Sequence, residues 1–249
     1  MAGHSKFKNI MHRKGAQDLL KAKLFAKLSR EISVATRIGG SEIESNIRLK
    51  SAVNAAKIAN MRKDNINREI KKGEGSDSDS SYFEVRYEGY GPGGTAIIVE
   101  ALTNNKNRTA SEIRTTFSKN GGSLGEIGSV SHNFTKLGNI IICKNIGKES
   151  DIFNFAIECG SVDFESNEDD FSIFCDIKDY NDLIQKFTSK FGNPKSNQLI
   201  WRSKTKVKLG IDNAQILFKL INTLEDNEDV QNISSNFEIN EEIMNQLIN

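Results

Sequence analysis

Residues 87–125 read YEGYGPGGTAIIVEALTNNKNRTASEIRTTFSKNGGSLG, and the fold of the surrounding chain is organised around them. Glycines crowd the start of this stretch. An apolar run rich in β-branched residues follows at 95–102, which is typical of a buried strand. A polar turn at 103–108 then opens an amphipathic helix at 109–120, which a pair of glycines ends. This order predicts one packed unit that displays polar side chains on its loops.

Two catalytic signatures occur in this stretch, and the context of each argues against catalysis. Residues 89–94, GYGPGG, match G-x-G-x-x-G, but a dinucleotide-binding loop follows a strand and opens a helix. Here the glycines precede a strand, so we predict a tight turn between two strands. Residues 121–125, GGSLG, match the nucleophile elbow G-x-S-x-G, but an elbow leads from a strand into a helix, whereas this segment leaves a helix.

The rest of the chain adds no other catalytic set. We find no metal-ligand cluster, nucleophile–base pair or phosphate loop, so we expect a protein that is not an enzyme and holds no cofactor. Cys143, Cys159 and Cys175 form no C-x-x-C pair and lie in or beside apolar runs, which predicts small core residues in a reducing compartment. No apolar run is long enough for a membrane span or a secretion signal, so we expect a cytoplasmic protein without a membrane partner.

The charge of the chain is distributed unevenly. Its 249 residues carry a formal net charge of only +1, yet residues 1–73 hold 17 Lys and Arg against 6 Asp and Glu. The remainder holds 17 against 27. A basic head on an acidic body predicts a polyanionic partner for the head. The alternative is that surface charge has drifted and the two halves attract each other.

Three amphipathic helices are predicted at 16–38, 46–60 and 64–72, and together they predict a basic helical domain of residues 1–75. The first helix carries a basic stripe with almost no acidic residue in it, so pairing within the helix does not explain the stripe. The arm before it surrounds Phe7 with basic residues, which suits phosphate contact with base stacking, although a flexible terminus is the alternative. The candidate nucleic-acid contacts here are His4, Lys6, Phe7, Lys8, His12, Arg13, Lys14, Lys23, Lys27 and Arg30.

A solvated linker at 73–81 separates this head from two α/β domains. Residues 135–204 follow the βαββαβ order of a ferredoxin-like unit and are predicted to be an inserted domain. The elements of 205–239 have too little apolar surface to stand alone, so we expect them to rejoin 82–134 in one middle α/β domain. Residues 240–249 are expected to form a loose tail. The predicted fold class is α+β multidomain, with an N-terminal three-helix domain, a middle α/β domain and the inserted ferredoxin-like domain.

The polar loop at 103–108 is predicted to contact the nucleic acid. It joins a buried strand to a helix, so its side chains are ordered. A helix cap by Asn107 would explain one of its amides but not the others. Side-chain amides suit irregular RNA edges better than a regular duplex, and Lys119, at the other end of the helix, is expected to lie close by. The candidates from this region are Asn104, Asn105, Arg108 and Lys119.

Several segments of the chain resemble the sequence of one protein family. In chain order, the segments are MAGHSKFKNIMHRKGAQD at 1–18, ANMRKDNI at 59–66, RYEGYGPGG at 86–94, TNNKNRT at 103–109, FSKNGGSLGEIGSV at 117–130 and LEDNEDVQN at 224–232. In these segments the chain resembles the YebC family, which includes the mitochondrial translational activator of cytochrome oxidase subunit one. The resemblance implies three domains and a non-enzymatic role in gene expression. It implies a role in transcription with DNA binding for most bacterial members, and a role in translation on the ribosome for the mitochondrial relative and some bacterial ones.

Two functions therefore compete for the same basic surface. No helix-turn-helix is evident, because no glycine marks the turn between the second and third helices and the basic stripe lies on the first. The family resemblance favours DNA, so we predict a DNA-binding transcriptional regulator. The alternative is a ribosome-associated translation factor that contacts ribosomal RNA.

Overall fold

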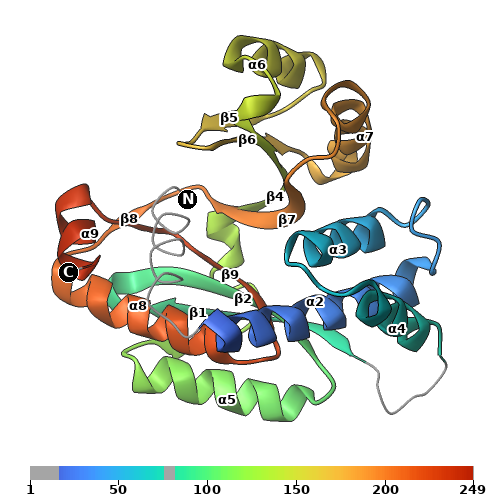
Figure 1. Cartoon of the computed structure of the whole chain (residues 1–249). Helices are drawn as coiled ribbons and strands as arrows, with labels where there is room; N and C mark the ends of the chain where they lie inside the picture. Colours follow the sequence, from blue (N-terminus) through green and yellow to red (C-terminus); the bar gives the residue numbers. More distant parts are fainter. Residues whose placement is uncertain (1–16, 76–81, 249) are drawn as a thin grey trace. The chain divides into compact units, whose positions relative to one another are not determined.

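The computed structural model describes residues 17–75 and 82–248, and it divides the chain into two compact units (Figure 1). One unit is Lys136–Arg202. Its bounds lie one and two residues inside those of the insertion predicted at 135–204. The other unit combines the chain up to Thr135 with the chain from Ser203 onward. The predicted fold class, α+β with three N-terminal helices followed by α/β sheets, is confirmed.

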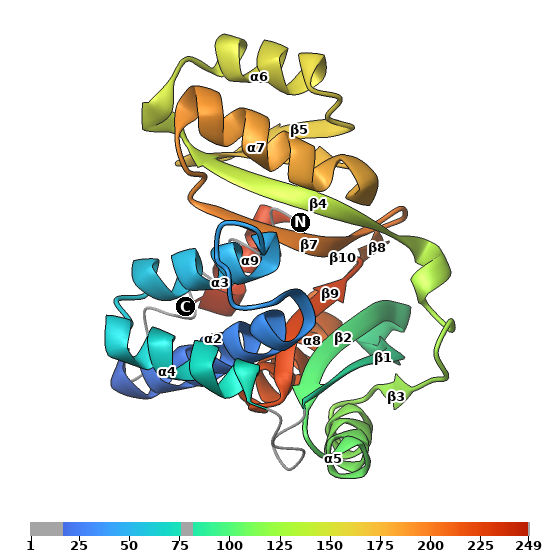
Figure 2. The ribbon, with the colours of Figure 1, turned by 90° about the vertical axis from the view of Figure 1, so that its right-hand side faces the viewer.

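Three helices form the N-terminal part, and they lie together in Figures 1 and 2. They are α2 (Gln17–Gly39), α3 (Ile47–Ile58) and α4 (Lys63–Glu74). Asn46 holds the corner between the first two: its Oδ1 accepts from the backbone N–H of Leu49 at 3.0 Å, and its Nδ2 donates to the carbonyl of Ala35 at 2.8 Å. This cap satisfies a helix end that would otherwise be left without a partner. The buried side chains between the helices are Ile32, Ala35, Leu49, Ala52, Val53, Ala56, Met61 and Ile66.

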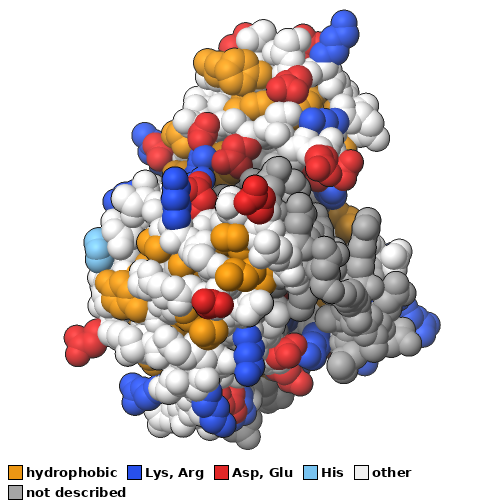
Figure 3. All heavy atoms as spheres, turned by 90° about the vertical axis from the view of Figure 1, so that its left-hand side faces the viewer, with side chains coloured by type: hydrophobic (Ala, Val, Ile, Leu, Met, Phe, Trp, Pro, Cys, Tyr) orange, Lys and Arg blue, Asp and Glu red, His pale blue; other side chains and the backbone are white. Residues whose placement is uncertain are grey.

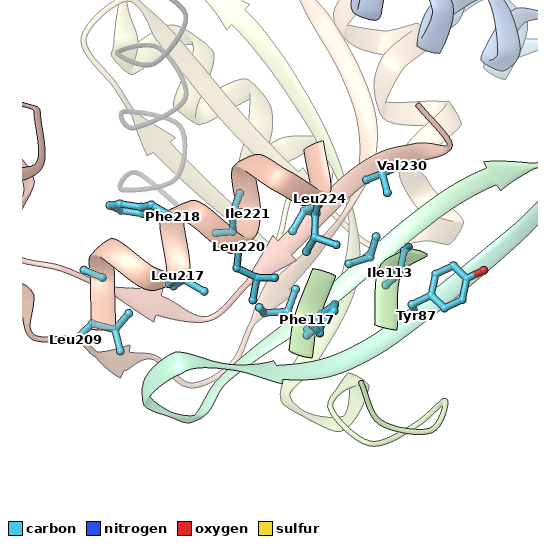
Figure 4. Packing of buried hydrophobic residues seen from close by; sticks show 14 of the residues in the cluster. Tyr87, Ile113, Phe117, Leu209, Leu217, Phe218, Leu220, Ile221, Leu224 and Val230 are labelled. Carbon is cyan, nitrogen blue, oxygen red and sulfur yellow. The ribbon is translucent and has the colours of Figure 1, made fainter. Parts of the chain in front are cut away.

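The middle part is a four-stranded sheet in the order β3-β1-β2-β9, with antiparallel neighbours. Its strands are β1 (Phe83–Gly91), β2 (Thr95–Thr103), β3 (Ser123–Leu124) and β9 (Val230–Ser235). Two helices pack on it, α5 (Lys106–Lys119) and α8 (Ile211–Asp226). Figure 4 shows Phe117 of α5 and Leu217 of α8 among the buried apolar side chains of this core. The elements after residue 203 thus complete a core that begins at residue 83.

The end of the chain corrects one prediction. Residues 240–249 are not a loose tail in the part described, because α9 (Glu241–Ile248) packs on the middle core. Met244 is buried, and Ile243 and Leu247 lie partly buried against the same cluster. The helix follows a short parallel pair, β8 (Val207–Lys208) and β10 (Phe237–Glu238).

The unit Lys136–Arg202 contains two helices on an antiparallel sheet in the order β5-β6-β4-β7. In chain order its elements are β4 (Phe134–Cys143), α6 (Glu149–Glu158), β5 (Asp163–Ser166), β6 (Asp170–Cys175), α7 (Tyr180–Phe191) and β7 (Ser196–Ser203). The first strand lies between the third and the fourth, as in a ferredoxin-like fold. Cys175 is buried here, and burial raises the pKa of its thiol to about 11, which suits a core residue.

The glycine turn between β1 and β2 gives a stability prediction. Gly94 has φ +74° and open space around it, whereas a Cβ at Gly91 would lie 2.7 Å from Thr95 Oγ1 and 2.8 Å from Ile97 Cδ1. We expect Val at either position to lower the free energy of unfolding by about 1–3 kcal/mol, through backbone strain at Gly94 and overpacking at Gly91.

Asn variants separate the two causes in urea denaturation. Gly94→Asn should recover much of the loss, because Asn tolerates positive φ, whereas Gly91→Asn should not. Unchanged stability of both Val variants would contradict a structural role for the turn.

Candidate nucleic-acid interface

The lysines of α2 that were expected to face a nucleic acid lie against an acidic segment of the same chain. This acidic turn, residues 225–229, joins the end of α8 to β9. Lys23 Nζ lies 2.7 Å from Asp226 Oδ1, and Lys27 Nζ donates to the Glu225 carbonyl at 3.1 Å. As predicted, pairing within the helix does not explain these two cations, but their partners belong to the same chain rather than to a nucleic acid. The partners lie 203 and 198 residues further along the chain, beyond the reach of pairing rules for one helix.

Two other predicted contacts, Arg30 and Arg108, meet at one buried carboxylate. Asp229 is 4% exposed; its Oδ1 lies 3.1 Å from Arg30 Nη1, and its Oδ2 lies 2.8 Å from Arg108 Nη2. The hydroxyls of Thr103 and Thr109 donate to the same Oδ2 at 3.0 and 2.7 Å. Burial acts to raise the pKa of this carboxyl, but its hydrogen bonds and the charge of Arg30 outweigh burial, so the pKa lies below its ordinary value. Asp229 thus ties α2 to the loop that opens α5.

The amides of the 103–108 loop also have partners within the chain. Asn105 caps α5, because its Oδ1 accepts from the backbone N–H of Arg108 at 3.1 Å. The alternative considered from the sequence, a cap by Asn107, named the wrong residue. Asn104 Oδ1 accepts from Arg108 Nη2 at 3.3 Å. The loop is ordered as predicted, but its order is explained by internal hydrogen bonds.

The predicted proximity of Lys119 to this loop is wrong. Lys106 begins α5, with its Nζ 4.5 Å from the centre of the Phe83 ring, and Lys119 ends the same helix. A helix of this length separates its ends by about 20 Å at 1.5 Å per residue. Lys119 is exposed, and it belongs to a different part of the surface.

The other predicted contacts belong to the N-terminal arm, which lies outside the described residues. They remain predictions. They are His4, Lys6, Phe7, Lys8, His12, Arg13 and Lys14.

A second buried carboxylate organises the loop after α5. Glu88 is 1% exposed, and its Oε2 accepts from the backbone N–H groups of Val130 and Ser131 at 3.0 and 2.9 Å. Arg86 Nε lies 2.9 Å from the other oxygen. Burial acts to raise the pKa of Glu88, but the backbone donors and Arg86 lower it below the ordinary value.

The helix α4 carries exposed cations that sequence reasoning did not select. The side chain of Arg68 is 71% exposed, that of Lys72 is 46% exposed, and Lys63 and Lys71 are also exposed. Lys63 and Lys71 are eight residues apart along KDNINREIKK, and Arg68 and Lys71 are three apart. These spacings place their side chains about 80° and 60° apart around a helix, and they were the available signal.

A shallow groove of about 420 Å³ lies between α5 and the end of α8. Its lining is Ser111, Glu112, Thr115, Thr116, Thr223, Asp226 and Asn227. The hydroxyls of Thr115 and Thr116 donate to backbone carbonyls of their own helix, at 2.8 and 2.9 Å, so no carboxylate of the groove activates them. Across residues 17–75 and 82–248, no group of three His, Cys, Asp or Glu residues is placed to hold a metal ion.

Comparison with known proteins agrees with this architecture. One family model, described as the TACO1/YebC protein N-terminal domain, matches residues 5–76, and another, described as the TACO1/YebC second and third domain, matches residues 82–237. The chain belongs to the TACO1/YebC family. The resemblance found in the sequence is thereby confirmed, and the family's name for its second and third domains is that of a transcriptional regulator.

A solved structure is similar to most of this chain. The crystal structure of a conserved hypothetical protein from Aquifex aeolicus is 41% identical, with a TM-score of 0.83. The match covers 90% of this chain and 92% of that one. Within the part of the chain that the structure describes, no helix has the length and apolar character needed to cross a membrane.

Proposed function

We propose that this protein is a non-enzymatic regulator of gene expression that binds nucleic acid through its basic N-terminal region, with DNA as the partner. The observation that carries the proposal is an excess of cations that folding leaves exposed. Residues 1–73 hold 17 Lys and Arg against 6 Asp and Glu, and the acidic turn engages only three of the cations on α2. The exposed cations in the described part of this region are Lys21, Lys57, Arg62, Lys63, Arg68, Lys71 and Lys72.

The excess of cations is confined to residues 1–73, because the remainder of the chain holds 17 Lys and Arg against 27 Asp and Glu. On the face shown in Figure 3, Lys and Arg alternate with Asp and Glu, so the described residues there form no continuous area of one charge. A surface of one sign attracts a polyanion and releases its counterions, which is the main source of affinity for DNA. We therefore assign binding to the helical domain and to the arm that precedes it, with Lys6, Phe7 and Arg13 among its contacts.

The alternative partner is ribosomal RNA, in the role of a translation factor. Its support from the sequence was the set of amides at 103–108, which suit irregular RNA edges. Asn105 Oδ1 caps the helix and Asn104 Oδ1 accepts from Arg108, so the amide oxygens of both residues already have partners within the chain. The family name for the second and third domains then favours DNA.

Binding of the full-length protein to a fluorescent DNA duplex, measured across a salt series, tests the proposal. If about six phosphates are contacted, the logarithm of the affinity should fall against the logarithm of salt with a slope near −5. The arm variant Arg13→Ala/Lys14→Ala should make this slope shallower by about 2. The matched control, Lys208→Ala/Lys219→Ala, removes two exposed lysines outside the helical region and should leave the slope unchanged.

Co-sedimentation with ribosomes, with and without nuclease, distinguishes the two partners. The DNA proposal expects duplex binding and little ribosome association. Arm-dependent ribosome association without duplex binding would reject DNA in favour of the translational role.

A further inference from the structure

Residues 59–62 connect α3 to α4 in a four-residue turn. The sequence has no glycine in this turn, and the turn forms without one. Asn60 has φ +60° and is the one non-glycine residue with positive φ among those described. Its backbone N–H donates to the Lys57 carbonyl at 2.9 Å, and that of Met61 donates to the Ala56 carbonyl at 2.9 Å. This pair of bonds is a Schellman motif with Asn in the left-handed position. A glycine is therefore not required for a helix-turn-helix at this corner, contrary to the expectation from the sequence.

The inner face of α4 is held closely against α2. Ile66 and Glu69 are buried, and so is Gly73. A Cβ at Gly73 would lie 2.6 Å from the Ser33 carbonyl oxygen and 2.6 Å from the Thr36 Cβ, so the two backbones approach too closely for any other residue. This contact decides which side of α4 faces outward.

The outward side of α4 is cationic and includes an amide. At 100° per residue, Lys63, Asn67 and Lys71 lie within about 80° of one another, and Arg68 lies about 60° beyond Lys71. All four are exposed. The carboxylate oxygen Oε1 of Glu69 is 3.8 Å from Arg68 Nε, longer than a hydrogen bond, so within residues 17–75 and 82–248 this carboxylate leaves the guanidinium donors to a partner.

We propose that α4 is the helix that lies in the major groove of duplex DNA, as the second helix of a helix-turn-helix formed with α3. This inference rests on the proposed function and names the element that performs it. Lysines at the edges of the face contact phosphates, whereas Asn67 and Arg68 have the side chains that pair with adenine and guanine edges in that groove. The major groove of duplex RNA is too deep and narrow for side chains to read, so a helix face of this kind selects DNA.

The test uses full-length protein and three ligands of one sequence: a DNA duplex, an RNA duplex and a DNA single strand. Lys63→Ala/Lys71→Ala should weaken duplex DNA binding by roughly 10- to 100-fold at about 0.1 M salt and make the salt slope shallower by about 2. Arg68→Ala should reduce the preference for the best duplex over its single-base variants by between about 5- and 150-fold at one position. Lys208→Ala/Lys219→Ala is the control of equal charge, and thermal melts verify that each variant is folded.

The outcomes separate this inference from the proposed function. Duplex DNA binding that the α4 variants leave intact overturns the role of α4 and keeps the proposed function. Equal, α4-dependent binding of the RNA duplex overturns the major-groove assignment. A wild-type protein that binds none of the three ligands overturns both.

Discussion

Replacing Asp229 with Ala is expected to lower the free energy of unfolding by about 3–5 kcal/mol, because removing one partner of a buried ion pair leaves the other groups uncompensated. Arg30 and Arg108 would lose their shared carboxylate, and the hydroxyls of Thr103 and Thr109 would lose their acceptor. Urea denaturation followed by circular dichroism measures the loss.

The matched control for this variant is Asp226→Ala, three residues earlier in the same acidic turn. The Asp226 side chain is 66% exposed, and an exposed ion pair such as the one with Lys23 contributes about 0–1 kcal/mol. Equal losses in the two variants would show that Asp229 is not the anchor of the loop.

The pH dependence of this effect has a definite direction. The pKa of Asp229 in the folded protein lies below its ordinary value, so its contribution is fully present above the unfolded pKa of about 3.9. The contribution is lost as the pH falls through the lower, folded pKa. The difference in stability between the wild type and Asp229→Ala should therefore be constant near neutral pH and shrink below about pH 4.

Replacing Glu88 with Ala is expected to lower the free energy of unfolding by about 3 kcal/mol, within the range for breaking a buried charge pair. The backbone N–H groups of Val130 and Ser131 would lose their acceptor, and Arg86 its carboxylate. Amide hydrogen exchange should increase first in residues 126–131, because that loop depends on this carboxylate.

Glu88→Gln and Glu84→Ala are the controls for this prediction. Gln keeps the shape and one acceptor oxygen, so its loss should be smaller than that of Ala. The side chain of Glu84 is 55% exposed on the same strand, where it pairs with Arg48, and its removal should change stability by no more than about 1 kcal/mol. A protected 126–131 loop in Glu88→Ala would rule out the anchoring role.

The acidic turn also changes how the charge asymmetry is interpreted. The basic head and the acidic remainder of the chain do attract each other at Lys23 and Arg30, which pair with Asp226 and Asp229. This attraction does not account for Arg68, whose side chain is 71% exposed and whose nearby carboxylate, Glu69, belongs to the same helix. The hypothesis of a polyanionic partner therefore rests on the cations of this domain that stay exposed, such as Arg68, and not on the α2 residues that pair with the acidic turn.

The sequence by itself determined the elements whose causes are local. Ile66 and Ile70 recur with the helical period in α4, the β-branched run at 95–102 makes a buried strand, and the glycines at 89–94 make the turn before it. The βαββαβ order of the inserted unit was equally readable, because each element has its own pattern of apolar residues. Met244 shows the limit of this reasoning: its helix is too short for its period to stand out from a tail.

Only the tertiary structure decided which polar groups remain available to a partner. Asp229 lies in an acidic turn that looks solvated in the sequence, yet it is buried where α2 and the 103–108 loop meet. Lys23 and Arg68 are both cations on helices of the basic head. Lys23 meets a carboxylate far along the chain, whereas Arg68 lies 3.8 Å from the carboxylate of its neighbour Glu69 and stays exposed. A buried ion pair joins segments far apart in the chain, and its energy depends on burial and geometry that no local pattern encodes.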